Sequence, residues 1–308
     1  MEKSIKKIIC YGEVLWDLLP SGLKPAGAPL NVAYHLKKMG VQSYIISRVG
    51  DDTLGEKILK IIKKWGVDDT FCRVDNNYPT GKVIAKVDAI LQEVSYEIME
   101  PVAWDFIAVE KEHSKVIKNT DGFVFQSLTA RNEISRKTLH ALLEHSCYKI
   151  FDVNLRPPFY SEHIIKELLE KSDLVKMSIS ELYEIVAWFQ PGKITEEEAV
   201  CFLKEDFNLK EILITKGSYG ASYYGIDQLC ERWGIHINVK DPIGSGDAFL
   251  AGFLAKKING NSSEEAMDQA ITLGAFVASK EGSCPYYEDL CTVYNVLNNL
   301  PYTYKQGI

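Results

Sequence analysis

The sequence predicts an α/β fold in which helices cover both faces of a mostly parallel sheet and a small β-rich lid is attached. From Gly122 onward, short apolar strands alternate with segments of helical periodicity, which is typical of a parallel sheet. Between Phe71 and Met99 the chain is instead β-rich, and no helical segment interrupts it. Because ligands of parallel sheets bind beyond the carboxyl ends of the strands, a site is expected there.

The composition is that of a soluble globular protein rather than of a nucleic-acid-binding or membrane protein. The 308 residues suit one large α/β domain, and 46% hydrophobic with 25% charged residues predicts a sizeable core. A net charge of −7 argues against general binding of nucleic acid. Seven cysteines without a C-x-x-C favour the reducing cytoplasm over a disulfide framework or a zinc site. No apolar run is long enough for a signal peptide or a membrane helix, so no membrane partner is expected.

The N-terminal third predicts two strands, two helices and part of the lid. Gly40 and Gly66 follow the two helical segments directly, as C-terminal caps often do. The segment after Gly12 and the β-rich stretch are expected to form a small antiparallel sheet. The remaining elements are strands at Lys7–Tyr11 and Val41–Val49, and helices at Ala28–Met39 and Thr53–Trp65.

The rest of the chain predicts repeated strand–helix units. Each strand is a short apolar run: GFVFQ, KIFDV, DLVKM and EILIT. A further β-rich section covers roughly Ala221–Val239. The helices are expected near Glu133–His145, Ser161–Lys171, Ser180–Phe189, Thr195–Glu205, Gly246–Lys257, Ser263–Lys280 and Tyr287–Leu297.

A glycine-rich turn, D-P-I-G-S-G-D, opens an apolar helix and carries the sharpest chemical signal. Gly244 and Gly246 let backbone N–H groups converge, and the helix start adds unpaired donors and partial positive charge. This arrangement suits the charge on a transferring phosphoryl group. Asp247 lies beside it, where a carboxylate accepts the proton of an attacking hydroxyl. The alternative is that Ser245 and Asp247 simply begin a structural helix.

The longer run from Asp241 to Gly252 resembles the D-x-x-G-x-G-D-x-F-x-x-G signature of the ribokinase-like (PfkB) carbohydrate kinases. Pro242 replaces the frequent threonine, and Ser245 the frequent alanine. The resemblance implies one ribokinase-like domain over 1–308, a three-layer α/β/α doubly wound fold whose lid comes from about 13–27 and 76–104. It also implies catalysis by Asp247 with the turn Gly244, Ser245 and Gly246.

A second cluster near the N-terminus suits a sugar, whose hydroxyls need fixed carboxylates and amides. The run from Ala26 to Ala33 resembles G-G-A-P-x-N-V-A of fructokinases, with Ala26 for the first glycine, and implies that Asp17, Gly27 and Asn31 bind the sugar. F-D-V-N-L-R resembles a run near the substrate and makes Arg156 a contact for phosphate or sugar. Alternatively, Asp17 is an ordinary turn residue, Asn31 caps a helix, and Arg156 forms a salt bridge at the end of a strand.

Further runs extend this resemblance. A-W-D at 103–105 looks like the return from the fructokinase lid. F-Q-S-L at 125–128, with R-N-E after it, resembles F-G-S-L…R-N-E and puts Gln126 in the place of a glycine.

The nucleotide end rests on two runs. V-K-M-S-I-S-E at 175–181 resembles V-K-x-N-x-x-E, which implies that Glu181 holds Mg²⁺ through water. Ser178 stands where the family has asparagine. The alternative is that Glu181 is an exposed helix residue with a structural role only. T-K-G-S-Y-G-A resembles T-x-G-x-x-G-A, which flanks ATP in the family, although a hairpin turn explains its glycines equally well. The implied ATP-binding residues are Lys176, Thr215, Lys216, Gly217, Gly220, Gly244 and Gly246. Positions matching Asp241, Ile243, Ser279 and Gly282 hold a monovalent cation such as K⁺ in some members.

Together these features predict a sugar kinase that uses ATP and Mg²⁺, with D-fructose as the first substrate and fructose 6-phosphate as product. The other candidate substrates are 2-keto-3-deoxygluconate, ribose and a nucleoside. A catalytically silent relative that binds sugar or nucleotide and acts in regulation is the alternative from another class. A homodimer formed through the lid is a family-based expectation, since an antiparallel sheet with one apolar face needs covering.

Overall fold

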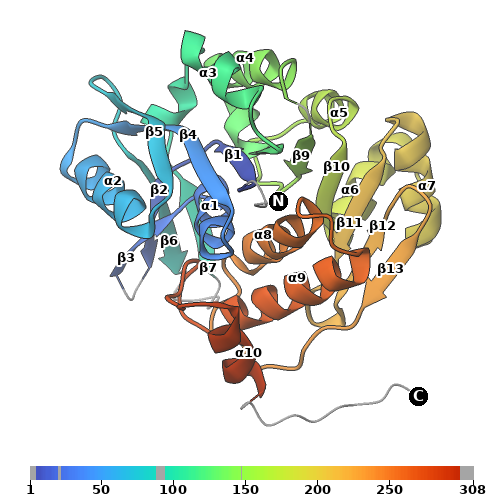
Figure 1. Cartoon of the computed structure of the whole chain (residues 1–308). Coiled ribbons are helices and arrows are strands. Elements are labelled where there is room, and N and C mark those ends of the chain that lie inside the picture. The colour runs from blue at the N-terminus through green and yellow to red at the C-terminus, as the bar shows by residue number, and fades with distance from the viewer. Residues whose placement is uncertain (1–4, 20–21, 88–93, 147, 299–308) are drawn as a thin grey trace.

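The computed structural model describes residues 5–19, 22–87, 94–146 and 148–298 (Figure 1). In this part of the chain, nine strands form the large sheet, in the order β13-β12-β11-β10-β9-β8-β1-β4-β5. The strands are β1 (Lys7–Tyr11), β4 (Gln42–Gly50), β5 (Asp68–Asp75), β8 (Gly122–Gln126), β9 (Lys149–Asp152), β10 (Leu174–Ser178), β11 (Glu211–Thr215), β12 (Ala221–Tyr224) and β13 (Leu229–Arg232).

The strand order contains a reversal that places the site. From β1 the chain moves outward through β4 to β5, then returns to β8 on the other side of β1 and continues outward to β13. All neighbours from β5 to β11 are parallel, and only β12 and β13 are antiparallel. The carboxyl ends of β1 and β8 therefore diverge at a topological switch point, where open α/β sheets bind ligands.

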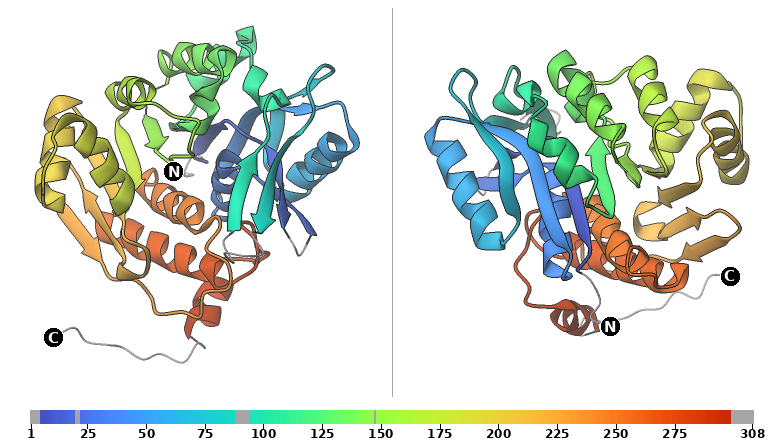
Figure 2. Two further views of the ribbon diagram at one scale, coloured as in Figure 1. Left: turned by 180° about the vertical axis from the view of Figure 1, so that it is seen from behind. Right: turned by 45° about the horizontal axis from the view of Figure 1, so that its top comes forward.

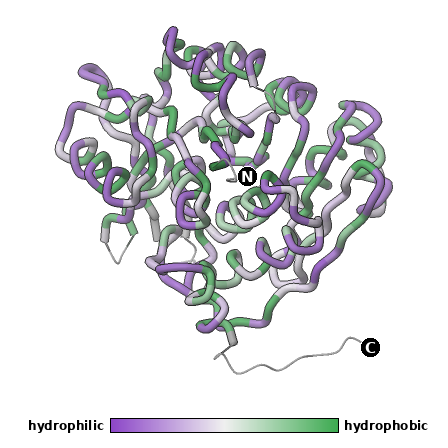
Figure 3. Tube along the Cα trace, viewed as in Figure 1, coloured by the Kyte–Doolittle hydropathy of each residue, from purple (hydrophilic) through white to green (hydrophobic). Residues whose placement is uncertain are grey.

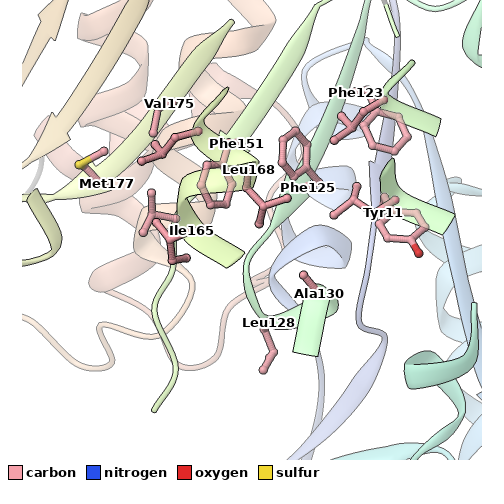
Figure 4. Close-up of a cluster of buried hydrophobic side chains, with 14 of the residues drawn as sticks. Tyr11, Phe123, Phe125, Leu128, Ala130, Phe151, Ile165, Leu168, Val175 and Met177 are labelled. Atoms are coloured by element: carbon pink, nitrogen blue, oxygen red, sulfur yellow. The ribbon is translucent and has the colours of Figure 1, made fainter. Parts of the chain in front are cut away.

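Helices cover both faces of the large sheet, and each face has its own core. Successive strand residues point to opposite faces: Ile8 and Cys10 join one buried cluster, whereas Ile9 and Tyr11 join the other. Figure 4 shows the second cluster, in which Phe125 and Phe151 from adjacent strands stack. The outer helices alternate hydrophobic and hydrophilic residues along their length (Figure 3), as helices with one buried face do.

The first cluster packs under α1 (Ala28–Lys38), α2 (Thr53–Trp65), α8 (Ser245–Lys257) and α9 (Ser263–Ala278). The second packs under α4 (Glu133–Leu143), α5 (Glu162–Glu170), α6 (Ile179–Phe189) and α7 (Glu196–Asp206). Two further helices lie in the described part of the chain, α3 (Lys111–Ile117) beside α4 and α10 (Leu290–Asn298) against α9. The predicted three-layer α/β/α fold is confirmed.

A separate four-stranded sheet lies beside the carboxyl edge of the large sheet (Figure 2, left). Its order is β3-β2-β6-β7, with β2 at Leu15–Leu19, β3 at Gly22–Ala26, β6 at Gly81–Val87 and β7 at Val94–Ile98. These strands fall within the ranges expected for the lid, of which residues 20–21 and 88–93 lie outside the described part.

Two details differ from the expectation. The small sheet is mixed rather than antiparallel, because β2 pairs with β6 in parallel. Between β3 and β6 the chain passes through α1, β4, α2 and β5, and such a crossover lets the chain return in the same direction. In addition, the first residues of the β-rich stretch, Phe71–Asp75, belong to β5 at the edge of the large sheet.

Most predicted helices begin and end within two or three residues of their expected positions, and α2 coincides with its prediction. The sequence did not predict α3, whose seven residues cover fewer than two helical turns. In the section expected to be β-rich, strands cover only β12 and β13, and residues 233–239 form no strand. No helix among the described residues is long and apolar enough to cross a membrane.

Candidate active site

A cavity of about 390 Å³ opens at the carboxyl edge of the large sheet, beneath the small sheet. Residues that follow β1, β8 and β9 meet there with Lys176 on β10, the start of α1 and the turn before α8. The predicted site residues among its lining are Asp17, Gly27, Asn31, Arg156, Lys176, Ile243, Gly244, Gly246 and Asp247. The fold therefore brings together residues that are more than 200 positions apart in the chain.

The glycine-rich turn has a backbone conformation and a close contact at Gly244 that leave no room for a side chain. Gly244 has a φ of 77° and is the N-cap of α8, and a Cβ added to it would lie 2.3 Å from the Cβ of Ser283. The carboxylate of Asp241 ties the turn to the segment after α9, since it accepts hydrogen bonds from the backbone N–H groups of Ile243 and Gly282, both at 3.0 Å. The hydroxyl of Ser245 donates to the carbonyl of Pro242 at 2.8 Å.

Asp247 lies in the first turn of α8 and is 9% exposed. Its Oδ2 accepts a hydrogen bond of 2.8 Å from Nδ2 of Asn31, in the first turn of α1. The hydroxyl of Ser283 donates to the other end of this amide at 3.0 Å, which fixes the amide orientation. Burial raises the pKa of Asp247, while Lys176, the hydrogen bond from Asn31, and Arg156 each act to lower it.

The start of α1 packs closely against the segment that follows β1. Gly27 has a φ of 119°, and a Cβ on it would lie 2.2 Å from the carbonyl oxygen of Glu13. The carboxylate of Glu13 accepts hydrogen bonds from the N–H of Ala28 at 3.2 Å and from the hydroxyl of Thr129 at 3.1 Å. It thus satisfies a donor at the start of α1, whose own N-cap is a glycine. Burial raises the pKa of Glu13 to about 7.

The small sheet contributes the opposite wall. Asp17 on β2 is half-buried and faces the cavity with the apolar side chains of Val83 and Ile98. Burial raises the pKa of Asp17 to about 6, with a further contribution from Asp241, while Arg156 opposes the rise. A polar ligand here lies between a carboxylate of the lid and the carboxylate of Asp247.

Two cations line the cavity. Arg156 follows β9 and is exposed, and its guanidinium donates one long hydrogen bond of 3.3 Å, to the carbonyl of the adjacent Leu155. Lys176 on β10 is buried, and its Nζ lies 2.9 Å from Oδ1 of Asp152. Asn154, between these strands, has a φ of 42°, uncommon for a residue with a side chain.

Four residues predicted for the nucleotide lie along the same edge but outside the cavity lining, namely Thr215, Lys216, Gly217 and Gly220, whereas Lys176, Gly244 and Gly246 line the cavity. Thr215 ends β11 and pairs in register with Ser178. Gly217 and Gly220 have φ angles of 59° and 104°, and a Cβ on Gly220 would clash with the carbonyl of Arg232. Lys216 forms ion pairs with Glu196 at 2.8 Å and Glu231 at 3.3 Å, so a phosphate would compete with two carboxylates for it.

Glu181 forms a capping box with Ser178 at the start of α6. Its Oε2 accepts from the N–H and the hydroxyl of Ser178, at 2.7 and 2.8 Å, and its Oε1 accepts from the N–H of Leu155 at 2.7 Å. The S-x-x-E pattern could have predicted this structural role from the sequence. Oε1 accepts only the bond from Leu155 among these three and keeps lone-pair capacity, which suits Mg²⁺ held through water, as this ion retains several waters and uses few carboxylates.

Comparison with known proteins identifies the family. The model of the pfkB family carbohydrate kinases matches residues 9–289. The chain belongs to this family. It is 27% identical to the fructokinase of Escherichia coli over 297 residues, which cover 90% of this chain and 94% of that protein.

Solved structures show that this pfkB kinase has the ribokinase-like fold. A fructokinase double mutant from Vibrio cholerae O395, with fructose, ADP and a potassium ion bound, has a TM-score of 0.83 at 23% identity and covers 96% of this chain and 100% of its own. Aminoimidazole riboside kinase from Salmonella enterica, with its riboside and an ATP analogue bound, has a TM-score of 0.78 at 22% identity, covering 95% and 100%.

Sequence reasoning missed several residues of this pfkB kinase that line or support the cavity. Glu13 was not predicted, although an acidic residue directly after a buried strand is a signal for a site. Asp152 and Gln126 are fully buried, and Nε2 of Gln126 donates a hydrogen bond of 3.4 Å to Oδ2 of Asp152. Nothing in the linear sequence shows that these two residues meet, because strand pairing alone places them side by side.

Proposed function

We propose that this chain transfers the γ-phosphoryl group of ATP to the primary hydroxyl of D-fructose, with Asp247 as the general base. The arrangement of Asp247 carries the proposal. Its carboxylate faces a cavity of sugar size, is oriented by Asn31, and lies in the first turn of a helix that a left-handed glycine begins.

The reaction follows from the position of these groups. The primary hydroxyl of the sugar lies beside Asp247, which takes its proton as the oxygen attacks the γ-phosphorus of ATP. The bond from this phosphorus to the bridging oxygen of ADP breaks in line with the attack. Amides of the first turn of α8, which lack partners within the helix, stabilise the charge on the phosphoryl oxygens.

The remaining cavity residues hold and shield the sugar. Asp17 accepts hydrogen bonds from the sugar hydroxyls, and the Asn31 amide donates to them. Gly27, which has no side chain, lets the sugar approach the backbone. Arg156 neutralises phosphate charge. Val83 and Ile98 exclude water, which limits hydrolysis of ATP.

The proposed reaction also involves two cations, Mg²⁺ and a monovalent ion such as K⁺. Glu181 is the carboxylate that would hold Mg²⁺ through water, and the ion when bound neutralises charge on the ATP phosphates. Asp241 with the backbone of Ile243, Ser279 and Gly282 is the proposed site for a monovalent cation. Its carboxylate already joins both segments, with hydrogen bonds to Ile243 and Gly282.

The relatives support fructose as the first substrate. The E. coli protein is a fructokinase, and the Vibrio structure contains fructose. A nucleoside is the second candidate, because the Salmonella enzyme with a similar fold is a riboside kinase. Ribose, 2-keto-3-deoxygluconate and a catalytically silent sugar- or nucleotide-binding protein remain the further alternatives.

A coupled assay of ADP release separates these candidates. It is run with D-fructose, D-ribose, 2-keto-3-deoxygluconate and adenosine, each with ATP and Mg²⁺ and with or without K⁺. We expect the highest kcat/KM for D-fructose, and phosphorus NMR of the product should show a phosphate ester at the 6-hydroxyl. A higher kcat/KM for another sugar would replace fructose, and no consumption of ATP with any of them would favour the silent relative.

The predicted homodimer through the lid and the cytoplasmic location stay predictions. Light scattering during gel filtration measures the mass of the assembly directly. A dimer that Leu23→Glu on the outer strand β3 converts to a monomer would support the lid as the interface, since Leu23 is exposed there.

A further inference from the structure

Lys176 is a buried cation next to the proposed base, and the mechanism above gives it no task. It is 8% exposed and lines the cavity together with Asp247. A Cβ added to Gly246 would lie 3.0 Å from its Nζ. The ammonium group therefore packs against the residue that directly precedes Asp247.

A chain of hydrogen bonds holds this ammonium in place. Its Nζ binds Oδ1 of Asp152 at 2.9 Å, and the other oxygen of Asp152 accepts from Nε2 of Gln126 at 3.4 Å. The carbonyl oxygen of Gln126 in turn accepts from Asn154 at 2.7 Å. Gln126 occupies the position of a glycine in the fructokinase-like run, so this chain has an extra amide beneath the cavity.

The surrounding charges determine the state of Lys176. Burial alone lowers its pKa, but the carboxylates of Asp152, Asp247 and Glu181 raise it, so the side chain stays charged. Burial raises the pKa of Asp152, and the ammonium of Lys176 opposes that rise. The titratable and charged groups that interact with Asp247 are Lys176, Arg156, Asp152, Glu13, Asp17 and Cys284.

We propose that Lys176 is a positioning residue for the base: its ammonium group keeps Asp247 ionised in the buried cavity, while Asp152 and Gln126 hold the ammonium against the turn. This inference rests on the proposed kinase function and gives Lys176 a role other than binding a phosphate of ATP. The ion pair with the fully buried Asp152 favours this role, because a phosphate-binding lysine has to turn toward its ligand.

Two substitutions with opposite expected effects test the proposal. Lys176→Gln removes the charge and keeps a donor for Asp152, so the acid limb of kcat/KM should move to higher pH. The ratio of kcat/KM at pH 8.5 to that at pH 6 should rise about tenfold, the change expected when a neighbouring opposite charge is lost. Asp152→Asn removes a repelling carboxylate but keeps an amide oxygen that accepts a hydrogen bond from the ammonium of Lys176, so the acid limb should stay or move to lower pH.

A general disturbance of the cavity would move the acid limb of kcat/KM in the same direction in Lys176→Gln and in Asp152→Asn, and that result would overturn the proposal. A rise in the KM for ATP in Lys176→Gln without any shift of the limb would also overturn it, and would assign the lysine to the phosphates. Lys176→Arg keeps the charge and should leave the limb close to that of the unmodified protein.

Lys257→Gln is the matched control. Its Nζ forms a partly buried ion pair, 2.5 Å from Oε1 of Glu211, but it lies outside the residues that line the cavity. We expect lower thermal stability and an unchanged acid limb.

A measurement that needs no activity separates this inference from the proposed function. Carbon NMR of the Asp247 carboxyl, assigned with Asp247→Asn, reports its titration directly. In Lys176→Gln the midpoint should lie at higher pH than in the unmodified protein, and an unchanged midpoint would overturn the inference. Absence of kinase activity in the unmodified protein would instead contradict the proposed function alone.

Discussion

At the scale of single residues, the proposed chemistry requires an ionised carboxylate inside a cavity that disfavours charge. Burial works against the ionised form of Asp247, and Asn31 and Lys176 work for it. Glu13 and Asp17 line the same cavity, and burial raises the pKa of both. The site therefore holds three acids, of which the one beside the glycine turn has the closest hydrogen-bond support from an amide.

Replacing Asp247 with asparagine should remove the base and keep the shape of the cavity. We expect kcat to fall about 10²- to 10⁴-fold, the usual contribution of a general base, while the KM for the sugar changes little. Steady-state ADP release measures both constants. Asp268→Asn on the exposed side of α9 is the control, and an unchanged kcat in Asp247→Asn would exclude this residue as the base.

Gly27 and Gly22 allow the effect of a close approach to be measured apart from that of backbone strain. Their φ angles are 119° and 116°, but a Cβ on Gly27 would lie 2.2 Å from backbone oxygen, whereas one on Gly22 meets nothing within 4 Å. Gly22→Ala should cost about 1–3 kcal/mol in the free energy of unfolding. Gly27→Ala should cost more and also raise the KM for the sugar. Denaturant unfolding and kinetics test this, and equal losses would contradict it.

At the scale of elements, α1 is fastened to the segment that follows α9. Tyr34 donates to the carbonyl of Pro285 at 2.8 Å, and the two ring nitrogens of His35 lie 3.0 Å from the hydroxyl of Tyr287 and 2.9 Å from the carbonyl of Ser283. These contacts continue those of Asn31 one turn along the helix. The orientation of Asn31 thus depends on a segment near the end of the described chain.

His35 makes this junction sensitive to acid. Burial lowers its pKa to about 4, so the unfolded chain takes up a proton at a higher pH than the folded chain. Its contribution to stability is therefore present above about 6.5 and is lost as pH falls toward 4. The loss should be on the order of 3 kcal/mol. Chemical unfolding from pH 8 to pH 4 should show a smaller loss in His35→Asn than in the unmodified protein, while the exposed His163→Asn should match the latter.

The predicted elements agree best with the structure where local pattern and packing require the same conformation. The helix Thr53–Trp65 has an acidic N-cap, apolar periodicity and a left-handed Gly66, and all three can be read in sequence. The small sheet was predicted as antiparallel because adjacent β-rich runs favour hairpins. The pairing of β2 with β6 joins segments more than 60 residues apart, and no local pattern encodes it.

The site residues also divide into those that a local sequence pattern indicates and those that depend on the pairing of distant segments. Asp247 and Gly244 were found because their chemistry depends on neighbours in the chain. Gln126 and Asp152 matter through strands that pair side by side, and Glu181 was interpreted for its charge while its capping role comes from local geometry. The sequence therefore indicates the proposed reacting groups more readily than the buried groups that lie behind them.

At the scale of the whole molecule, the cavity has walls from both sheets, so its closure depends on how the small sheet lies over the large one. Val83 on β6 supplies part of the apolar wall. Val83→Ser should raise the KM for the sugar and increase the fraction of ATP hydrolysed without sugar phosphorylation, because water enters more easily.

Comparing ADP release with sugar phosphate formation measures that fraction. Val74→Ser, at an exposed position of β5 in the large sheet, is the matched control and should leave the ratio unchanged. Tight coupling in Val83→Ser would show that the small sheet does not exclude water.

The hydrogen bonds that join Asn31 to Asp247 and to Ser283 also have a meaning for synthesis of the protein. Asp247 and Ser283 lie 216 and 252 positions after Asn31 in the chain. The Asn31 amide therefore cannot form these hydrogen bonds until most of the chain has been translated. A ribosome-bound chain that stops before α8 has Asn31 of the first helix but lacks Asp247, the proposed base. On the proposed mechanism, the nascent protein therefore cannot phosphorylate a sugar until about the last fifth of the chain has emerged and folded.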